Sequence, residues 1–209
     1  MSRENLILIG AGGHSISCID VIEQEGRFKI AGLVGRTQEV GTKLFDYLVL
    51  STDSGLPKLA KQYPFALITV GQIVTAEHRI RLFREALDAG FKFPSIVSPN
   101  AYVSQRAEIG QGTIVMHGAI VNAGVKIGDN CIINSNSLIE HESHIADHCH
   151  ISTGAILNGG VSIGSECFIG SGSIVKQCIS IGAKTLVGMG LTVRKDLGEN
   201  TKLLNETTV

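Results

Sequence analysis

The sequence predicts an α/β domain followed by a parallel β-helix, and two observations lead to this fold class. Every sixth residue from Val103 to Val193 is Val, Ile or Leu, at sixteen successive positions without an insertion. A strict period of six with aliphatic residues is typical of a hexapeptide β-helix. Before residue 98, apolar strand-like runs alternate with stretches of helical spacing, which predicts a small parallel sheet packed against helices.

Residues 1–97 are expected to form the α/β domain. Strands are expected over 5–10, 29–35 and 65–71, with one helix after residue 14 and a second over 75–89. Helical spacing predicts the buried faces of these helices, which are Ile16, Ile19 and Ile22 in the first and Ile80, Phe83 and Leu87 in the second. Gly90 is expected to stop the second helix.

Residues 98–195 are expected to form the β-helix, and residues 196–209 a C-terminal tail. Three hexapeptides close one coil, so residues 18 apart in the sequence stack on one another. Cys131, Cys149 and Cys167 have this spacing and should form one interior column of small buried groups. Five cysteines in a chain of cytoplasmic character do not suggest disulfides. The chain has no Cys-x-x-Cys pair, so a thiolate zinc site is not expected.

Composition excludes several classes of protein. The 209 residues include 18 Lys and Arg and 19 Asp and Glu, a net charge of −1 that argues against nucleic-acid binding. No apolar run reaches the roughly 18 residues that a membrane span needs, and the first residues lack the apolar region of a signal peptide. A cytoplasmic protein without a membrane span is therefore expected.

A glycine-rich turn follows the first expected strand. Gly10, Gly12 and Gly13 lie where this strand leads into a helix, a position that favours anions and lets a ligand approach the backbone. The turn lacks the third glycine of a dinucleotide site, and no acidic residue ends the second strand, which argues against NAD. A smaller nucleotide and a purely structural turn both remain open, and Arg36 is either a phosphate or carboxylate contact or a surface residue.

Histidines are the second signal for function. Four of them, His141, His144, His148 and His150, lie within ten residues. In an extended coil their side chains leave different faces, which argues against a common metal ion. A role as general base fits His141 better. The residues one coil before and after His141, and those one coil before and after Glu142, are Ala or Gly and leave room for a ligand. A structural role for each histidine remains the alternative.

Together, the Gly-x-Gly-Gly-His turn and the Ile-Glu-His-Glu segment at 139–142 resemble the family of sialic acid O-acetyltransferases and UDP-4-amino-sugar N-acetyltransferases, over nearly the whole chain. The resemblance implies a left-handed β-helix, acetyl-CoA as co-substrate and no metal. It implies His141 as general base, with Glu142 raising its basicity. The implied acetyl-CoA contacts are His150, Gly170, Ser171, Gly188 and Met189. The implied sugar-nucleotide contacts are Gly12, Gly13, His14, Gly35, Arg36, Gly71 and Gln72.

The function that follows is transfer of an acetyl group from acetyl-CoA to an amino group of a nucleotide-activated amino sugar of the 4-amino-4,6-dideoxy type, in surface-glycan biosynthesis. Direct transfer is expected, because no cysteine is placed to form an acyl-enzyme. O-acetylation of sialic acid or a related sugar, and sugar-nucleotide binding without catalysis, are the alternatives. A hexapeptide carbonic anhydrase would need three zinc-binding histidines, and His117 and His141 fall on different faces.

A bare triangular prism has flat faces and no cleft. A site at His141 therefore needs a neighbouring subunit as its second wall, and a homotrimer is expected.

Overall fold

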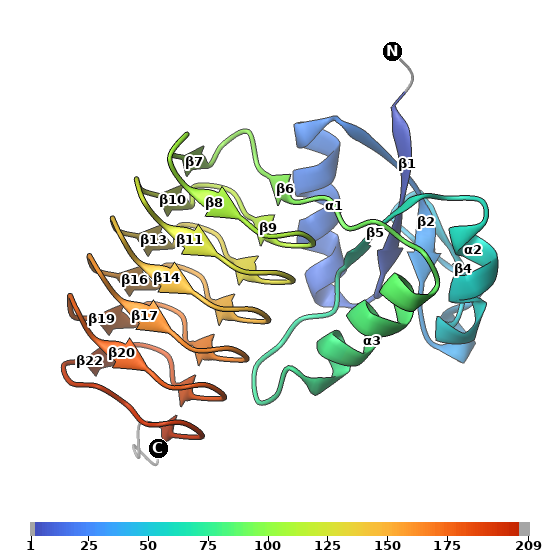
Figure 1. The fold of residues 1–209 in the computed structure, drawn as a ribbon. Helices are drawn as coiled ribbons and strands as arrows, with labels where there is room; N and C mark the ends of the chain where they lie inside the picture. Colours follow the sequence, from blue (N-terminus) through green and yellow to red (C-terminus); the bar gives the residue numbers. More distant parts are fainter. Residues whose placement is uncertain (1–2, 205–209) are drawn as a thin grey trace. The chain divides into compact units, whose positions relative to one another are not determined.

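The computed structural model describes residues 3–204, which divide into two compact units. One unit holds the chain up to Gly71 and then Glu77–Ile96, and the other holds Gln72–Ala76 and the chain from Val97 onward. The first is an α/β unit and the second a parallel β-helix (Figure 1), so the predicted fold class is confirmed. The end of the expected tail, 205–209, lies outside the described residues. No helix within 3–204 is long and apolar enough to cross a membrane.

The α/β unit is built on a five-stranded sheet of order β3-β4-β2-β1-β5. Strands β4, β2, β1 and β5 are parallel, and β3 pairs with β4 in the antiparallel sense. In chain order the elements are β1 (Glu4–Ile9), α1 (Gly13–Glu25), β2 (Phe28–Val34), η1 (Thr37–Glu39), β3 (Lys43–Leu44), β4 (Tyr47–Ser51), η2 (Asp53–Gly55), α2 (Leu56–Ala60), β5 (Phe65–Ile68) and α3 (Glu77–Asp88). The carboxyl ends of the four parallel strands therefore meet at one edge of the sheet.

Helix α1 corrects one predicted core residue. The helix begins after Gly12 and ends at Gly26, which has the left-handed conformation (φ 74°) that an α-helix C-terminus favours. Cys18, Ile19 and Ile22 are buried, but Ile16 is 42% exposed, so its placement in the core was wrong. At about 100° per residue, Ile16 lies roughly 60° beyond Ile19 around the helix axis, outside the arc that packs on the sheet. Leu87, at the end of α3, is likewise partly exposed.

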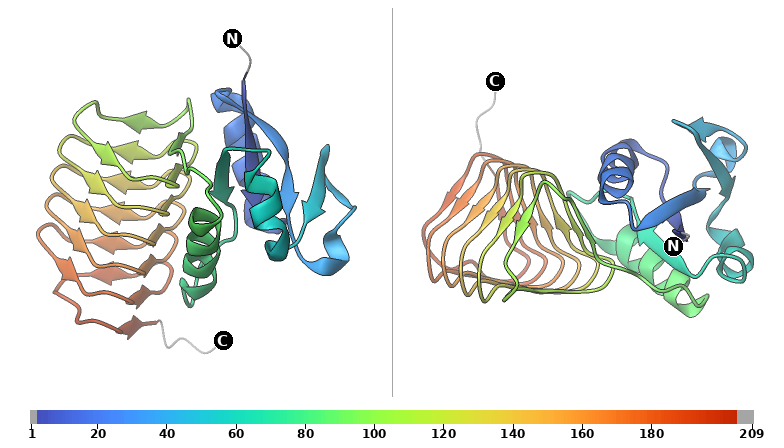
Figure 2. Two further views of the ribbon diagram at one scale, coloured as in Figure 1. Left: turned by 45° about the vertical axis from the view of Figure 1, so that its right-hand side comes forward. Right: turned by 90° about the horizontal axis from the view of Figure 1, so that it is seen from above.

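The β-helix consists of two-residue strands at intervals of six. The second residues of β7 to β22 are the sixteen aliphatic positions of the sequence repeat, and most are fully buried. The strands are β6 (Ile96–Val97), β7 (Tyr102–Val103), β8 (Glu108–Ile109), β9 (Ile114–Val115), β10 (Ile120–Val121), β11 (Lys126–Ile127), β12 (Ile132–Ile133), β13 (Leu138–Ile139), β14 (His144–Ile145), β15 (His150–Ile151), β16 (Ile156–Leu157), β17 (Ser162–Ile163), β18 (Phe168–Ile169), β19 (Ile174–Val175), β20 (Ser180–Ile181), β21 (Leu186–Val187), β22 (Thr192–Val193) and β23 (Lys202–Leu203). From β7 to β22 each pairs in parallel with the strand 18 residues away, and the coils stack in register (Figure 2).

From residue 112 to residue 190, each corner of the β-helix turns through one residue in the left-handed conformation. Positive φ angles recur at every sixth residue from 112 to 190. Half of these fourteen positions are glycine; the others are Asn130, Asn136, Glu142, His148, Glu166, Cys178 and Lys184. The corners are therefore fixed by backbone geometry as well as by the buried aliphatic residues.

The predicted cysteine column lies inside the coils. Cys131, Cys149 and Cys167 are fully buried, and the backbone N–H of Cys149 lies 3.4 Å from the sulfur of Cys131. The Cys149 thiol donates to the carbonyl of Gly164 at 3.0 Å. All five cysteines are free thiols, and Cys178 is exposed.

Two of the three outer faces of the β-helix differ in polarity. The face formed by β7, β10, β13, β16, β19 and β22 presents a row of apolar side chains, which are Tyr102, Ile120, Leu138, Ile156 and Ile174. We call this row the apolar face; its Tyr102, Ile120 and Ile174 are 60%, 40% and 39% exposed. The face of β8 to β20 presents polar residues, which are Glu108, Lys126, His144, Ser162 and Ser180.

Candidate functional site

The α/β unit contains a cavity of about 580 Å³ at the carboxyl ends of β1, β2, β4 and β5. It also borders the N-terminus of α1, where backbone N–H groups favour an anion, and the first turn of α1 has no acidic residue. The lining consists of residues 10–14, 34–39, 52–54, 69–71, His78 and Leu82.

Six of the seven residues expected to contact a sugar nucleotide line this cavity, which are Gly12, Gly13, His14, Gly35, Arg36 and Gly71. A Cβ atom added at Gly12 or Gly13 would meet no atom within 4 Å, so both positions face open space. Gln72 is not part of the lining; it is only 4% exposed, and its side-chain amide donates to the Cys167 carbonyl at 3.4 Å.

Several cavity residues were missed in the sequence. Thr52, Asp53 and Ser54 follow β4, and His78 lies at the start of α3. An apolar run over Tyr47–Ser51 was the available signal, because a parallel strand delivers the residues after it to the same edge as the glycine turn. His78 carried no signal of its own, since only the packing of α3 brings it to the cavity.

A second pocket, of about 420 Å³, surrounds His141 in the β-helix. Three successive coils contribute to its lining, with Glu140, His141 and Glu142 from the first, Asn158, Gly159 and Gly160 from the second, and Gln177 and Cys178 from the third. The 18-residue period relates these residues to one another, so they could have been predicted from the sequence repeat. Cys178, to which the sequence pattern gave no role, also lies in this lining.

His141 and Glu142 meet because they lie at a corner. Glu142 has φ 59°, and its Oε2 is 3.4 Å from Nδ1 of His141. The imidazole lies over Gly159, where an added Cβ would approach its Cε1 and Nε2 to 2.7 Å. Both side chains are well exposed, 64% for His141 and 79% for Glu142. When Nδ1–H donates to the carboxylate, Nε2 is left to accept a proton, the arrangement that a general base requires.

Glu140 stabilises this corner from the other side. Its Oε2 accepts a hydrogen bond from the Asn122 amide at 2.9 Å and a longer one from the backbone N–H of His141 at 3.4 Å. The first glutamate of the Ile-Glu-His-Glu segment therefore holds the backbone of the base, while the second contacts its ring.

The five residues expected to contact acetyl-CoA do not form one group. Gly170, Ser171, Gly188 and Met189 lie on the corner at the opposite edge of the apolar face from His141, and Met189 is 76% exposed. Gly170 packs so closely on the next coil that a Cβ would lie 2.5 Å from the backbone of Gly188 and Met189.

His150 lies apart from that group and is only 7% exposed. Its Nδ1 is 2.7 Å from the Gln72 carbonyl and its Nε2 is 3.1 Å from the Asn134 amide nitrogen, so both ring nitrogens have protein partners. Phe168 packs edge-on against the ring. In this arrangement His150 offers neither nitrogen to a substrate.

The histidine-rich segment does not converge on an ion. Among residues 3–204 no three His, Cys, Asp or Glu side chains lie close enough to hold a metal.

Models of known protein families match parts of both units. A family model described as the PglD N-terminal domain matches residues 5–84. A bacterial transferase hexapeptide model (six repeats) matches residues 106–141, and a model for the hexapeptide repeat of succinyl-transferase matches residues 160–195. Curated proteins gave no match.

Solved structures match over almost the whole chain. Perosamine N-acetyltransferase from Caulobacter crescentus, solved with CoA and GDP-perosamine, has 30% sequence identity and a TM-score of 0.91, covering 98% of this chain and 95% of its own. The chain belongs to the hexapeptide-repeat sugar acetyltransferases. The acetyltransferase domain of PglB from Neisseria gonorrhoeae, solved with acetyl coenzyme A, is 28% identical with a TM-score of 0.89 and covers 98% and 97% of the two chains. WeeI from Acinetobacter baumannii, at 23% identity and TM-score 0.83 over 96% and 97%, shares the fold.

The two pockets of this sugar acetyltransferase differ in chemistry. The cavity of the α/β unit combines glycine backbone, a helix N-terminus and the guanidinium of Arg36, which suit a phosphorylated ligand. The pocket of the β-helix combines an imidazole, carboxylates and exposed glycine backbone, which suit proton transfer.

Proposed function

We propose that this protein transfers the acetyl group of acetyl-CoA to the amino group of a nucleotide-linked amino sugar. The observation that carries the proposal is the His141–Glu142 pair at a glycine-lined corner of an acetyltransferase β-helix. The cavity in the α/β unit supports a nucleotide-linked acceptor. The 30% identical relative, named as an N-acetyltransferase and solved with a nucleotide sugar, favours an amine over a hydroxyl acceptor.

In the proposed reaction the neutral amine of the sugar attacks the thioester carbonyl carbon of acetyl-CoA. A C–N bond forms, the C–S bond breaks, and Nε2 of His141 takes the proton that the nitrogen loses and passes it to the departing thiolate of CoA, which leaves as the free thiol. Imidazole suits this role because it takes up and releases protons near neutral pH. The carboxylate of Glu142 stabilises the imidazolium that forms. Acetyl transfer is direct, with no acyl-enzyme.

The proposal is tested by assaying the protein with acetyl-CoA against nucleotide-linked amino sugars, free amino sugars and sialic acids. N-acetylation of a nucleotide-linked amino sugar is expected. His141→Ala should lower kcat by about 10²–10⁴-fold, the usual share of a general base, with the KM for acetyl-CoA largely kept. Acetylation of a sugar hydroxyl alone would favour the O-acetyltransferase alternative, and binding without turnover would favour the non-enzymatic one.

We infer further that the active form is a homotrimer. The apolar face is exposed in the single chain, and His141 lies on the corner at one of its edges. Gly170, Ser171, Gly188 and Met189, the expected acetyl-CoA contacts, lie on the corner at the other edge. A second copy packed on this face would cover its aliphatic side chains and supply the second wall that the His141 pocket lacks.

Light scattering should then give about three times the 22.2 kDa chain mass. Ile120→Glu combined with Ile174→Glu should yield monomers with little activity, because two charges would be buried in the interface. Ser162→Glu on the polar face is the matched control and should stay trimeric and active. A 22 kDa wild-type particle under assay conditions would overturn the assembly.

We also place the enzyme in the cytoplasm and in surface-glycan biosynthesis, because its proposed substrates, acetyl-CoA and a nucleotide sugar, are metabolites of that compartment. The N-acetylated product would be a sugar donor for a glycosyltransferase. Mass spectrometry of surface glycans from cells lacking the gene tests this, with loss of one N-acetyl group per modified sugar expected.

A further inference from the structure

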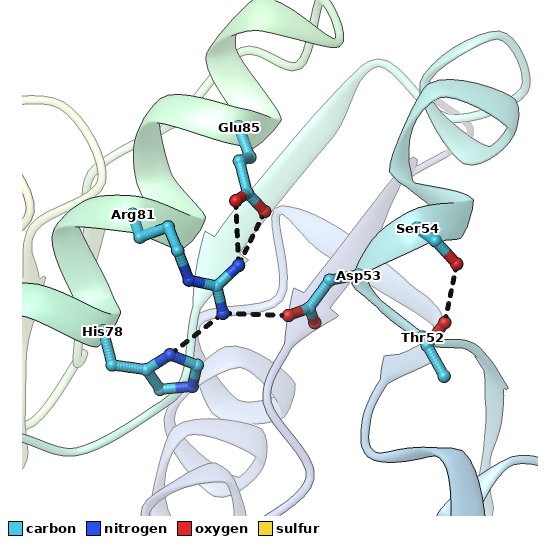
Figure 3. Close-up of polar contacts among 6 residues, drawn as sticks. All are labelled: Thr52, Asp53, Ser54, His78, Arg81 and Glu85. Carbon is cyan, nitrogen blue, oxygen red and sulfur yellow. Dashed lines mark hydrogen bonds and ion pairs between the residues drawn. The ribbon is translucent and has the colours of Figure 1, made fainter.

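His78 is a histidine of the α/β unit to which the sequence pattern gave no role. It lies in the first turn of α3, is exposed, and lines the cavity together with Thr52, Asp53 and Ser54. Its Nδ1 is 3.1 Å from Nη2 of Arg81, one helical turn further along (Figure 3). The ring is therefore held at the cavity by a neighbouring guanidinium.

Arg81 is itself fixed by two carboxylates. Nη2 donates to Oδ2 of Asp53 at 3.1 Å, and Nη1 donates to both oxygens of Glu85 at 2.8 and 2.9 Å. Figure 3 shows the guanidinium enclosed by Glu85, Asp53 and His78. The hydrogen bonds that Arg81 donates to Glu85 and then to Asp53 raise its pKa, so it remains a cation and a donor.

This contact determines the tautomer of His78. A guanidinium has donors only, so Nδ1 must act as the acceptor, and the neutral ring carries its proton on Nε2. His78 therefore presents an N–H donor on the side of the ring away from Arg81. Arg81 is held by three hydrogen bonds to Asp53 and Glu85, so the Nε2–H donor of His78 has a defined direction. The His78 side chain therefore loses little conformational freedom when a ligand binds.

We propose that His78 is a specificity-determining residue that donates a hydrogen bond from Nε2 to an acceptor oxygen of the bound sugar nucleotide, and that Arg81 is its positioning residue. This rests on the proposed function, since it assumes that the cavity binds the nucleotide. The acceptor is either a phosphate oxygen or an oxygen of the nucleoside, and direct binding experiments separate the two.

The test measures binding by calorimetry, without acetyl transfer. GDP, UDP, CDP and dTDP are titrated first, followed by pyrophosphate and the nucleoside of the diphosphate that binds best. His78→Ala should weaken diphosphate binding about 5- to 30-fold, the range for one lost hydrogen bond to a polar or charged acceptor. Melting temperature should not change, because the side chain is exposed. Weaker pyrophosphate binding would identify a phosphate oxygen, and weaker nucleoside binding an oxygen of the base or ribose.

Two further variants separate positioning from a merely structural role. In His78→Gln the side-chain amide can donate from nearly the same place, so binding should stay within about threefold of wild type. Arg81→Met should weaken binding, and adding His78→Ala to it should have less than the additive effect, because the two residues act on one hydrogen bond. His144→Ala, an exposed histidine on the polar face of the β-helix, is the matched control and should bind normally.

The outcomes distinguish the inference from the proposed function. If wild type binds a diphosphate and His78→Ala binds it within twofold, the role of His78 is wrong while the nucleotide site stands. Equal losses in His78→Gln and His78→Ala would show that the donor is not what matters. If wild type binds none of the four diphosphates, the nucleotide site of the proposed function falls and the role of His78 falls with it.

Discussion

The position of the candidate base depends on a residue with no side chain. Because the imidazole of His141 lies over Gly159, a Cβ there would approach Cε1 and Nε2 to 2.7 Å, and the ring would have to move. Gly159→Ala should therefore lower kcat by roughly tenfold or more through misplacement of the base, with the KM values less affected.

The backbone at Gly159 does not have a positive φ, so Gly159→Ala should not strain the chain. Thermal unfolding should show a melting temperature close to that of wild type. Gly198→Ala, where a Cβ meets no atom within 4 Å, is the control for a glycine replacement in the same β-helix. Wild-type kcat in Gly159→Ala would mean that the ring is not held where the structure has it.

Glu142 occupies one of the fourteen corner positions with positive φ, half of which are glycine. Its φ of 59° is unfavourable for a residue with a Cβ, by roughly 1–2 kcal/mol. From this position the carboxylate reaches Nδ1 of His141. Glu142→Gly should therefore stabilise the protein slightly, by about 0.5 kcal/mol after the greater flexibility of unfolded glycine is counted, while kcat falls roughly tenfold.

Lys184→Gly provides the comparison for Glu142→Gly. Lys184 has φ 56° at another corner and does not line the His141 pocket. Chemical denaturation should show a similar gain in stability, and steady-state kinetics should show an unchanged kcat. Full activity in Glu142→Gly would remove the carboxylate from the mechanism.

At the scale of elements, the turn between β1 and α1 contains glycines of two kinds. Gly13 starts the helix and faces open space, so Gly13→Ala should fold at least as well as wild type. Its new methyl group would enter the cavity that we propose binds the nucleotide, and we expect the KM for the sugar nucleotide to rise about tenfold with that for acetyl-CoA unchanged.

Gly10 has a different reason to be glycine. Its φ is 130°, and a Cβ would lie 2.9 Å from the backbone nitrogen and Cγ2 of Val70. Gly10→Ala should lower the free energy of unfolding by about 1–3 kcal/mol. If Gly13→Ala raised both KM values equally, the two substrates would not be divided between the two pockets as proposed.

At the scale of the whole molecule, buried thiols make stability dependent on alkaline pH. Burial raises the pKa of Cys18 from 9.0 to about 12, although the nearby charge of Arg79 acts in the opposite direction. Burial also raises the pKa of Cys149. Because the folded pKa exceeds the unfolded one, the unfolded chain loses its thiol protons first as pH rises. The contribution of these buried thiols to the free energy of unfolding is complete below pH 9 and decreases between pH 9 and about 12.

Urea unfolding at fixed protein concentration measures this effect. The two thiols should leave the free energy of unfolding equal at pH 7.5 and 8.5 and should lower it above pH 9. Cys18 alone should account for about 1 kcal/mol of that loss at pH 10. Cys18→Ala should reduce the slope, whereas Cys178→Ala, at an exposed position, should keep the wild-type slope. A wild-type slope in Cys18→Ala would show that its thiol ionises in the folded protein.

Sequence by itself determined the β-helix down to the register of its coils. A period of six leaves only one way to turn all sixteen aliphatic residues inward, so the strands β7 to β22, the cysteine column and the neighbours of His141 one coil away all followed from residue spacing. The glycine turn was equally readable, because a glycine-rich link from strand to helix is a local feature.

Tertiary structure alone decided which other residues reach the sites. Thr52–Ser54 and His78 belong to separate elements, and only the pairing of β4 with β2 and the packing of α3 against β5 bring them to the glycine turn. The burial of His150 under the Gln72 carbonyl, 78 residues away in sequence, likewise has no local signal. The physical reason is that a repeat fixes the neighbours of a residue by spacing, whereas contacts between distant segments depend on side chains packing together in three dimensions.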